Sequence, residues 1–464
     1  MPRRDTIVAW LALSGLALLL PSGTAAQDED LKQRVEGLEE RLRELESERA
    51  VDPAPSADEP VSEPTLADSA QRSLAEWARY VRVSGSANTG YYYGQTDSVM
   101  SDRDFRVWDA RLFVDAELGG DVRLGDAVLV RNAGFSFEWN IARIGSLQND
   151  LGELYIELQG LGDSAAANLQ LGRFQIPVGE AYLRYSRGVS DKPFITDPVG
   201  GPWYWDEGVK LYGATRNAKF GYVASVTDGE ESWGAAESDP NPDKQVSLRL
   251  YADPAPWLHV SVSGLRSGRL GSNSTAASGS LWLGETWARA FGAGSGVPNV
   301  VDGAVAADGP NQIRDTWLGA ADVIFRRPDL GHLWLAYGAY HIDSRGASFY
   351  DRTLHYWIAE AVVEGRAIWD PLLGFYLGLR GHGLSTYDPD RGYLLDFRYA
   401  GTLGYNMQSL DMLTSVVGWH LTPWLDLRLE YNRVWIDLVR GAPVSVRRAA
   451  RRADTFAIEL GAHF

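Results

Sequence analysis

Apolar and polar residues alternate with a period of two along most of the chain after about residue 80. A β-strand turns successive side chains to opposite faces, so each such segment predicts a strand with one apolar and one polar face. The last ten residues, TFAIELGAHF, are the clearest case, and their apolar face holds Phe456, Ile458, Leu460 and Phe464. The same pattern occurs in FRVWDARLFVDAEL (105–118), where Trp108, Ala110 and Leu112 share the apolar face, and in LDLRLEYN (425–432).

The polar faces of these segments repeatedly carry charged residues, often two or three per strand. In a barrel that spans a membrane, the apolar face of each strand meets lipid and the charged face meets water inside. The pattern therefore favours a transmembrane antiparallel β-barrel. One interpretation is structural, with neighbouring acids and bases pairing on the barrel wall. The alternative is a track that selects ions. The residues predicted to face the lumen are Asp109, Arg111, Glu138, Glu157, Glu364, Arg366, Arg380, Arg428, Glu430 and Glu459.

Short and long connections alternate between the predicted strands, as they do in outer-membrane barrels with short periplasmic turns and long external loops. The short turns are 160–165, 215–218, 252–257, 326–331, 369–373 and 421–424. The longer links are 143–150, 177–206, 228–243, 267–313, 344–352, 385–410 and 439–454.

Counting the segments between these links predicts an all-β fold of sixteen strands. They are 80–94, 105–118, 128–142, 151–160, 166–176, 207–215, 218–227, 244–253, 256–266, 314–327, 331–343, 353–366, 371–384, 411–422, 424–438 and 455–464. An even count lets both barrel ends lie in the periplasm. The segments 280–291 and 393–405 also resemble strands; we place them in external loops, and counting both gives eighteen.

The region before the barrel predicts three further segments. Residues 1–26 have two arginines, an apolar run and small residues suited to cleavage, which indicates a secretory signal peptide; the alternative is a single membrane anchor. Residues 27–50 carry leucines and a valine at coiled-coil spacing, and a lone solvated helix is the alternative. The Pro-, Ala- and acid-rich residues that follow make 51–79 a flexible linker before the barrel at 80–464.

Composition and motifs narrow the function. The chain has no cysteine. Its net charge of −17 argues against nucleic acid as a partner. We find no Gly-x-Ser-x-Gly, no Gly-Lys-Ser/Thr and no His-Glu-x-x-His motif, and the seven histidines are scattered. We therefore predict no enzyme activity, no cofactor and no metal site, although separate strands of a barrel lipase can assemble a Ser-His pair.

Two segments resemble the phosphate-selective porin O and P family. They are LQLGRFQIPVGEAYLR (169–184) and VVGWHLTPWLDLRLEYNRV (416–434), and the order of a coiled coil before a barrel also fits. The resemblance implies a trimeric, sixteen-stranded outer-membrane porin whose third external loop folds into the pore. It also implies arginines and lysines along the channel of phosphate-selective members. This chain departs from that pattern, because residues 80–464 carry about ten more acidic than basic residues.

The loop from Pro177 to Trp205 is the predicted pore constriction. Its glycines and prolines suit a compact, bent course, and Pro177 helps turn the chain away from the wall. Its bases, Arg184, Arg187 and Lys192, with Arg173 just upstream, are the candidates for attracting anions. The alternative is that these bases face the rim or pair with Asp191.

These features predict an outer-membrane porin that allows passive diffusion of small hydrophilic solutes, ions among them, with phosphate or other anions as candidates. The alternative is a structural anchor whose coiled coil reaches the cell wall. The expected partners are membrane lipid, a homotrimer and the outer-membrane assembly machinery, which reads a terminal aromatic such as Phe464. The run RRAARR (447–452) either contacts lipopolysaccharide phosphates or is a solvated loop.

Overall fold

The computed structural model describes most of the barrel region of the chain. The predicted signal peptide, coiled coil and linker, the segment 280–291 and the run 447–452 all lie outside the described residues. The described residues are 80–94, 103–143, 146–180, 192–200, 205–229, 243–268, 313–344, 352–386, 396–397, 405–438 and 454–464.

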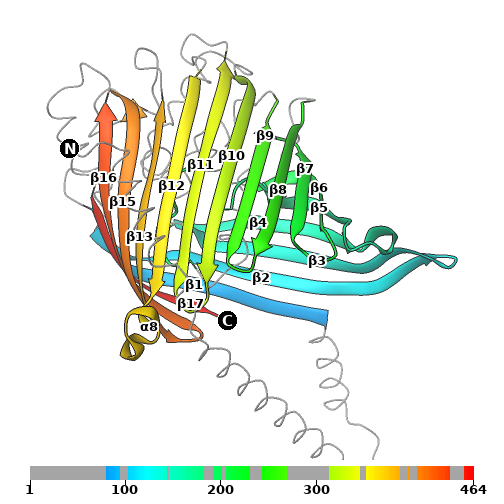
Figure 1. Cartoon of the computed structure of the whole chain (residues 1–464), viewed down its shortest axis with the longest axis horizontal. Coiled ribbons are helices and arrows are strands. Elements are labelled where there is room, and N and C mark those ends of the chain that lie inside the picture. The colour runs from blue at the N-terminus through cyan, green and yellow to red at the C-terminus, as the bar shows by residue number, and fades with distance from the viewer. Residues whose placement is uncertain are drawn as a thin grey trace, which may run out of the picture. The chain divides into compact units, whose positions relative to one another are not determined.

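Sixteen long strands form a closed antiparallel β-barrel, as the alternation predicts (Figure 1). Fifteen of their sixteen pairings join wall strands that follow one another along the chain. The sixteenth joins the first strand, β1, to the last, β17, with Tyr91 opposite Ile458, and it closes the barrel. The strands are β1 (Val81–Gly94), β2 (Arg103–Leu124), β3 (Ala127–Arg143), β4 (Ser146–Gln159), β5 (Asn168–Gln175), β6 (Trp205–Ala214), β7 (Phe220–Thr227), β8 (Gln245–Ala255), β9 (Leu258–Arg266), β10 (Ile313–Arg327), β11 (Gly331–Ser344), β12 (Arg352–Glu364), β13 (Phe375–Thr386), β15 (Tyr405–Thr422), β16 (Leu425–Leu438) and β17 (Thr455–His463).

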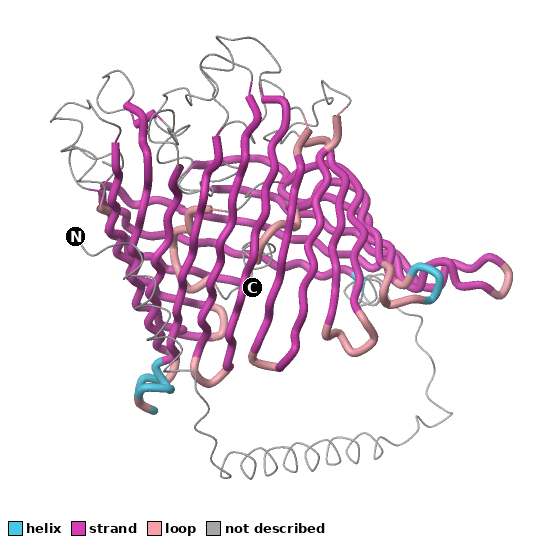
Figure 2. The backbone as a smooth tube through the Cα atoms, turned by 45° about the horizontal axis from the view of Figure 1, so that its top comes forward, coloured by secondary structure: helices cyan, strands magenta, loops and turns pink. Residues whose placement is uncertain are grey.

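The short connections lie along one edge of this wall, which we call the turn end (Figure 2). They include the 3₁₀ turn η1 (Leu161–Asp163) after β4, and the short helix α8 (Gly365–Ile368) with the 3₁₀ turn η3 (Asp370–Leu372) between β12 and β13. Trp257, Trp369 and Trp424 lie in three of these connections and are 50–63% exposed. Exposed aromatic residues at the edge of an apolar band are typical of a membrane interface.

The outer surface is apolar and the inner surface is charged. Along β17, Phe456, Ile458 and Leu460 are 37–40% exposed, whereas the intervening Ala457 and Glu459 are buried. In water, such a continuous apolar exterior would cost free energy at every strand, so the barrel requires an apolar surrounding. Among the described residues, no helix is long and apolar enough to cross a membrane.

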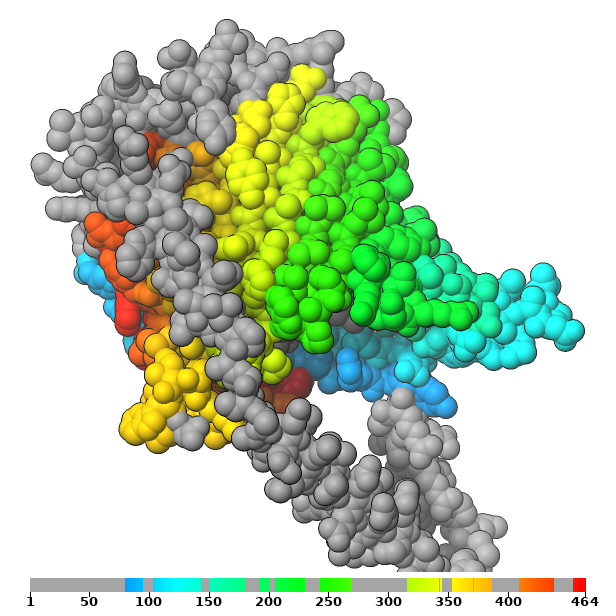
Figure 3. Space-filling view, in the orientation of Figure 1, coloured from blue at the N-terminus to red at the C-terminus, as the bar shows by residue number. Residues whose placement is uncertain are grey.

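The hairpin of β2 and β3 is longer than predicted. Val81 pairs with Ala116 and Asn132 with Gln159, so residues 117–131 extend past both neighbouring strands. This projection is visible in cyan in Figures 1 and 3. The sequence pattern stops at Gly119 and Gly120, where alternation is lost. Pairing nevertheless continues to a two-residue turn, in which Gly125 adopts a φ of +60° that suits a tight hairpin.

Three other predicted boundaries were wrong. The link 143–150 is mostly strand, because β3 continues to Arg143 and β4 begins at Ser146. The strand expected to reach residue 366 ends at Glu364, since α8 takes over at Gly365. The link expected to reach residue 410 ends earlier, because β15 begins at Tyr405. In the segment 393–405, which we placed in an external loop, the two-residue strand β14 (Asp396–Phe397) pairs with the start of β15, outside the sixteen-stranded wall.

Trp108 does not share the outer apolar face that the alternation predicted for it. The β1–β2 register shifts between Asn88 and Thr89, which leaves Trp108 as an extra residue in a β-bulge. Its side chain is 5% exposed and stacks on Tyr92, with ring centroids 4.5 Å apart. The bulge therefore turns one tryptophan into the barrel interior.

Candidate functional site

The connection between β5 and β6, which we call the inward loop (residues 176–204), enters the barrel. Residues 176–180 and 193–200 are all buried although they belong to no strand. At its start, the backbone N–H of Gly179 donates a 2.9 Å hydrogen bond to Ser263 Oγ on β9. Glu180 forms ion pairs with Arg249 on β8 and, at 3.0 Å, with His259 on β9. The first arm of the loop is thus fixed to β8 and β9.

The second arm of the inward loop is fixed to β13 and β16. The carboxylate of Glu430 on β16 accepts hydrogen bonds from the backbone N–H of Ile195 at 2.6 Å and from Thr196 Oγ1 at 2.7 Å. Arg380 on β13 donates a 2.6 Å hydrogen bond to the backbone carbonyl of Thr196. The backbone N–H of Val199 donates to Nδ1 of His382, at 2.7 Å.

Apolar packing reinforces the second arm. Ile195 is in a buried cluster with Tyr92, Trp108 and Ala457, so the bulged tryptophan contributes to holding the loop. Phe194 is in a second cluster, with Val362, Tyr376 and Val416, and the guanidinium of Arg380 lies 4.3 Å from the centre of its ring. Close packing against several strands leaves this arm little freedom to move.

The two arms of the loop are attached to different parts of the barrel wall. Three strands, β10–β12, separate β9 from β13. Following the strand order, β8 and β16 are separated by six strands in one direction (β9–β13 and β15) and by eight in the other. Residues 181–191, which contain Arg184 and Arg187, lie outside the described residues.

The other two predicted constriction residues have partners in the wall or the loop. Arg173 on β5 is 5% exposed and donates a 3.1 Å hydrogen bond to the carbonyl of Gly152, with Glu207 3.9 Å away. Lys192 Nζ lies 2.7 Å from a carboxylate oxygen of Asp197, within the inward loop. Of the two, only Lys192 belongs to the inward loop.

Five of the ten predicted lumen-facing residues pair with one another on the inner wall. Arg111 contacts Asp109 at 3.0 Å and Glu138 at 3.3 Å. Arg428 lies 3.6 Å from Glu459, whose carboxylate also accepts a 2.6 Å hydrogen bond from Tyr92.

The remaining predicted wall residues differ in their surroundings. Glu157 accepts a 2.7 Å hydrogen bond from Gln170, and Glu364 borders a cavity described below. Arg366 does not face the interior, because it lies on α8 and is exposed. The predicted strand ran two residues too far at this end.

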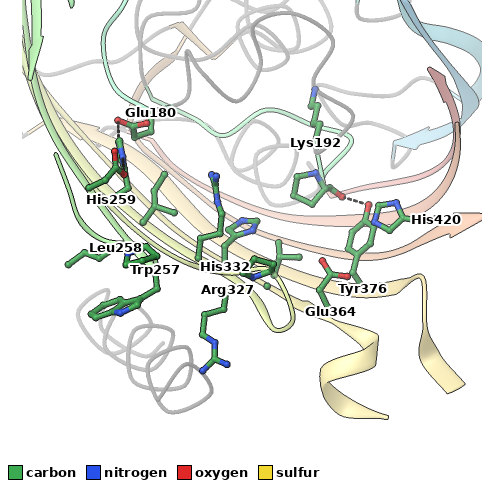
Figure 4. Close-up of a pocket in the computed structure, with 18 residues that line it drawn as sticks. Glu180, Lys192, Trp257, Leu258, His259, Arg327, His332, Glu364, Tyr376 and His420 are labelled. Carbon is green, nitrogen blue, oxygen red and sulfur yellow. Dashed lines mark hydrogen bonds and ion pairs between the residues drawn. The ribbon is translucent and has the colours of Figure 1, made fainter. Parts of the chain in front are cut away.

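A cavity of about 560 Å³ lies between the inward loop and the turn end of β8–β13 and β15 (Figure 4). Glu180, Lys192 and Pro193 contribute from the loop. Figure 4 shows Glu180 and His259 facing each other on one side, and Tyr376 and His420 together on the other. Tyr376 donates a 2.9 Å hydrogen bond to the carbonyl of Pro193, which joins the wall to the loop.

Three histidines border this cavity, His259, His332 and His420, and sequence reasoning treated them as scattered. A signal was present, because each lies within three residues of a short turn between strands. Such positions gather at one end of a barrel whatever their distance along the chain. In the described part of the chain, no group of three or more His, Cys, Asp or Glu is arranged to hold a metal ion.

Glu180 is an ionisable residue of the inward loop that borders the cavity. Burial alone would raise the pKa of its carboxyl group, but the hydrogen bond with His259 and the charge of Arg249 outweigh that effect and lower the pKa to about 2. Glu180 therefore stays charged at all ordinary pH values.

No protein-family model matches the sequence, and no similar sequence is found among curated proteins. Solved structures do resemble the fold. The outer-membrane channel DcaP of Acinetobacter baumannii aligns with a TM-score of 0.51 and 11% identity, over 83% of this chain and 97% of that chain. The anion-selective porin from Comamonas acidovorans (TM-score 0.50, 10% identity) and the trimer form of Vibrio cholerae OmpT (0.50, 11%) each align over 83% of this chain and 99% of theirs. The chain thus has the barrel fold of outer-membrane porins.

Proposed function

We propose that the protein is an outer-membrane porin through which small hydrophilic solutes, ions among them, diffuse passively. The observation that carries the proposal is the inward loop, whose arms are attached to β8–β9 and to β13–β16 inside a barrel with an apolar exterior. A loop held inside the barrel narrows the passage and brings its own charges to it. An anchor needs no such loop.

The orientation and assembly follow from the same proposal. Short turns face the periplasm in outer-membrane barrels, so we infer that the turn end and the N-terminal segment lie there. One of the similar structures, OmpT of Vibrio cholerae, is described as a trimer form, and we propose a homotrimer for this chain as well. Residues 27–50 are proposed to contribute to its assembly as a coiled coil.

The solute preference is the finer part of the proposal. We infer a preference for anions, with phosphate among the candidates, because Arg184, Arg187 and Lys192 fall within nine residues of the inward loop. Low-dielectric walls strengthen such a local charge, so it outweighs a more distant acidic surplus. One similar structure is described as an anion-selective porin, which supports this choice. Membership of the phosphate-selective family would agree with it.

The test is a planar-bilayer recording of the purified, detergent-extracted protein. We expect stepwise increases in conductance, and in a salt gradient a zero-current potential with the sign of anion preference. A heat-denatured sample of the same preparation is the control and is expected to give no steps. If the native protein inserts without conductance, the barrel is an anchor and the porin proposal fails.

A further inference from the structure

The three histidines that border the cavity share one arrangement. Each contacts a carboxylate, and each of these carboxylates also faces an arginine. In the first group, His259 Nε2 lies 3.0 Å from Glu180, which pairs with Arg249. We call the three sets of residues the triads, and the other two join strands farther along the wall.

The second and third triads repeat this geometry. His332 Nε2 lies 2.8 Å from Glu360, whose other oxygen is 3.4 Å from Arg380. His420 Nδ1 lies 2.6 Å from Asp426, whose other oxygen is 3.8 Å from Arg428.

In every triad the histidine is the most exposed member. The arginine side chains are 0–5% exposed and the carboxylates 0–3%, whereas the histidines His259, His332 and His420 are 21%, 14% and 45% exposed. The arginine and carboxylate charges therefore offset each other within the wall. The histidine is the member of each triad that both meets the cavity and changes its charge between about pH 5 and pH 8.

The fixed charges that border the cavity are balanced. Three basic side chains, Lys192, Arg326 and Arg327, face three acidic ones, Glu180, Asp253 and Glu364. With neutral histidines, the formal charge of this lining is therefore zero, and three protonated histidines raise it to +3. The formal charge of the cavity lining thus depends on whether its three histidines are protonated.

Other charged and titratable groups lie around the histidines and the cavity lining. His259 also contacts Asp253 at 2.8 Å and stacks on Tyr251. His420 lies against the ring of Tyr376, and Asp426 is also 3.8 Å from His463, whose ring adds a further titratable group. Lys192 and Arg327 form ion pairs with two carboxylates that do not border the cavity, Asp197 and Asp329.

We propose that this cavity is a proton-regulated binding site for small inorganic oxyanions at the turn end of the barrel. Protonation of His259, His332 and His420 makes the cavity cationic and admits the anion, and deprotonation releases it. Arg326, which borders the cavity and is exposed, supplies a permanent guanidinium to the site. The physiological meaning of the site rests on the proposed porin function, whereas its existence does not.

Inorganic sulfate is the probe of choice, because its charge is constant over the relevant range. Titration calorimetry on the detergent-solubilised protein at pH 5.5 and pH 8.0 measures the binding directly. We expect the dissociation constant for sulfate to be at least about tenfold lower at pH 5.5. Equal affinity at the two pH values would overturn the proposal, as would an absence of binding at pH 5.5.

Substitutions locate the effect. The triple variant His259→Gln, His332→Gln, His420→Gln keeps polar side chains and is expected to lose the pH dependence of sulfate binding. His355→Gln is the matched control, because His355 lies on the exposed side of β12 and bonds Tyr337 rather than a triad. A triple variant that keeps the wild-type pH dependence contradicts the proposal.

Two further measurements keep the outcome clear. If the triple variant does not fold, as judged by heat-modifiable gel migration, the single variant His420→Gln replaces it, and an unchanged pH dependence there counts against the proposal. Bilayer conductance without pH-dependent sulfate binding overturns this inference alone. Sulfate binding with the predicted pH dependence but no conductance overturns the porin function and leaves the site.

Discussion

The carboxylate of Glu430 accepts a 2.6 Å hydrogen bond from the backbone N–H of Ile195, 235 residues earlier in the chain. The same carboxylate accepts bonds from the backbone N–H and the hydroxyl of Thr196. One wall residue therefore satisfies three donors of a buried segment of the inward loop.

Replacing Glu430 with Gln is expected to loosen the inward loop. Each hydrogen bond to a charged acceptor contributes about 1.5–3 kcal/mol, and the amide offers fewer acceptor sites than the carboxylate. In single-channel recordings, we expect larger and noisier conductance steps. Glu157→Gln is the control, since Glu157 bonds Gln170 on the wall and not the loop. If Glu430→Gln gives conductance steps with the size and noise of the wild type, another contact holds the loop.

Neutralising the basic residues of the inward loop is expected to change the ion preference of the channel. The variant Arg184→Gln, Arg187→Gln, Lys192→Gln removes three positive charges and leaves Asp197 without its 2.7 Å partner. The zero-current potential in a salt gradient is expected to move toward cation preference. Arg366→Gln, on the exposed helix α8, is the control and is expected to leave the potential unchanged. Unchanged selectivity and conductance in the triple variant would mean that this loop does not line the pore.

Glu180 is expected to make the barrel less stable in acid. Its pKa falls from 4.5 in the unfolded chain to about 2 in the fold, so its stabilising effect is fully present above pH 4.5 and is lost as the pH falls through 2. The shift corresponds to about 3 kcal/mol. Urea unfolding in detergent at pH 6 and pH 2.5 measures it. The stability difference between wild type and Glu180→Gln is expected to shrink at the lower pH, and a constant difference would contradict this account.

Phe464 is expected to matter more for assembly than for stability. Its backbone N–H and carbonyl both bond Gly85, each at 3.0 Å, while the residue as a whole is 66% exposed. Phe464→Ala keeps both backbone bonds, so we expect nearly wild-type folding into detergent in vitro and markedly less barrel in the outer membrane of cells. Phe456→Ala, another exposed aromatic on β17, is the comparison. Equal membrane levels for the wild type and Phe464→Ala would show that the terminal aromatic is not read.

The wall of the barrel could be predicted from sequence because alternation is a local property. Leu425, Leu427 and Leu429 face outward and Asp426, Arg428 and Glu430 inward simply because successive residues of a strand point to opposite sides. The alternation of short and long connections then yields sixteen paired strands. Errors arose where a local rule is broken, as at Gly119 and Gly120 in the β2–β3 hairpin and at the bulge beside Trp108.

The interior was decided only by the tertiary structure. The composition of 177–205 indicates a bent loop, but nothing local in it names Glu430 or Arg380 as its attachment points. Likewise, His259, His332 and His420 are far apart in sequence, and barrel closure brings them to one cavity. The physical reason is that side chains meet across a lumen according to register, strand order and curvature, which depend on every strand of the closed ring. Alternation determines which side of the wall a residue faces, and closure determines what it meets there.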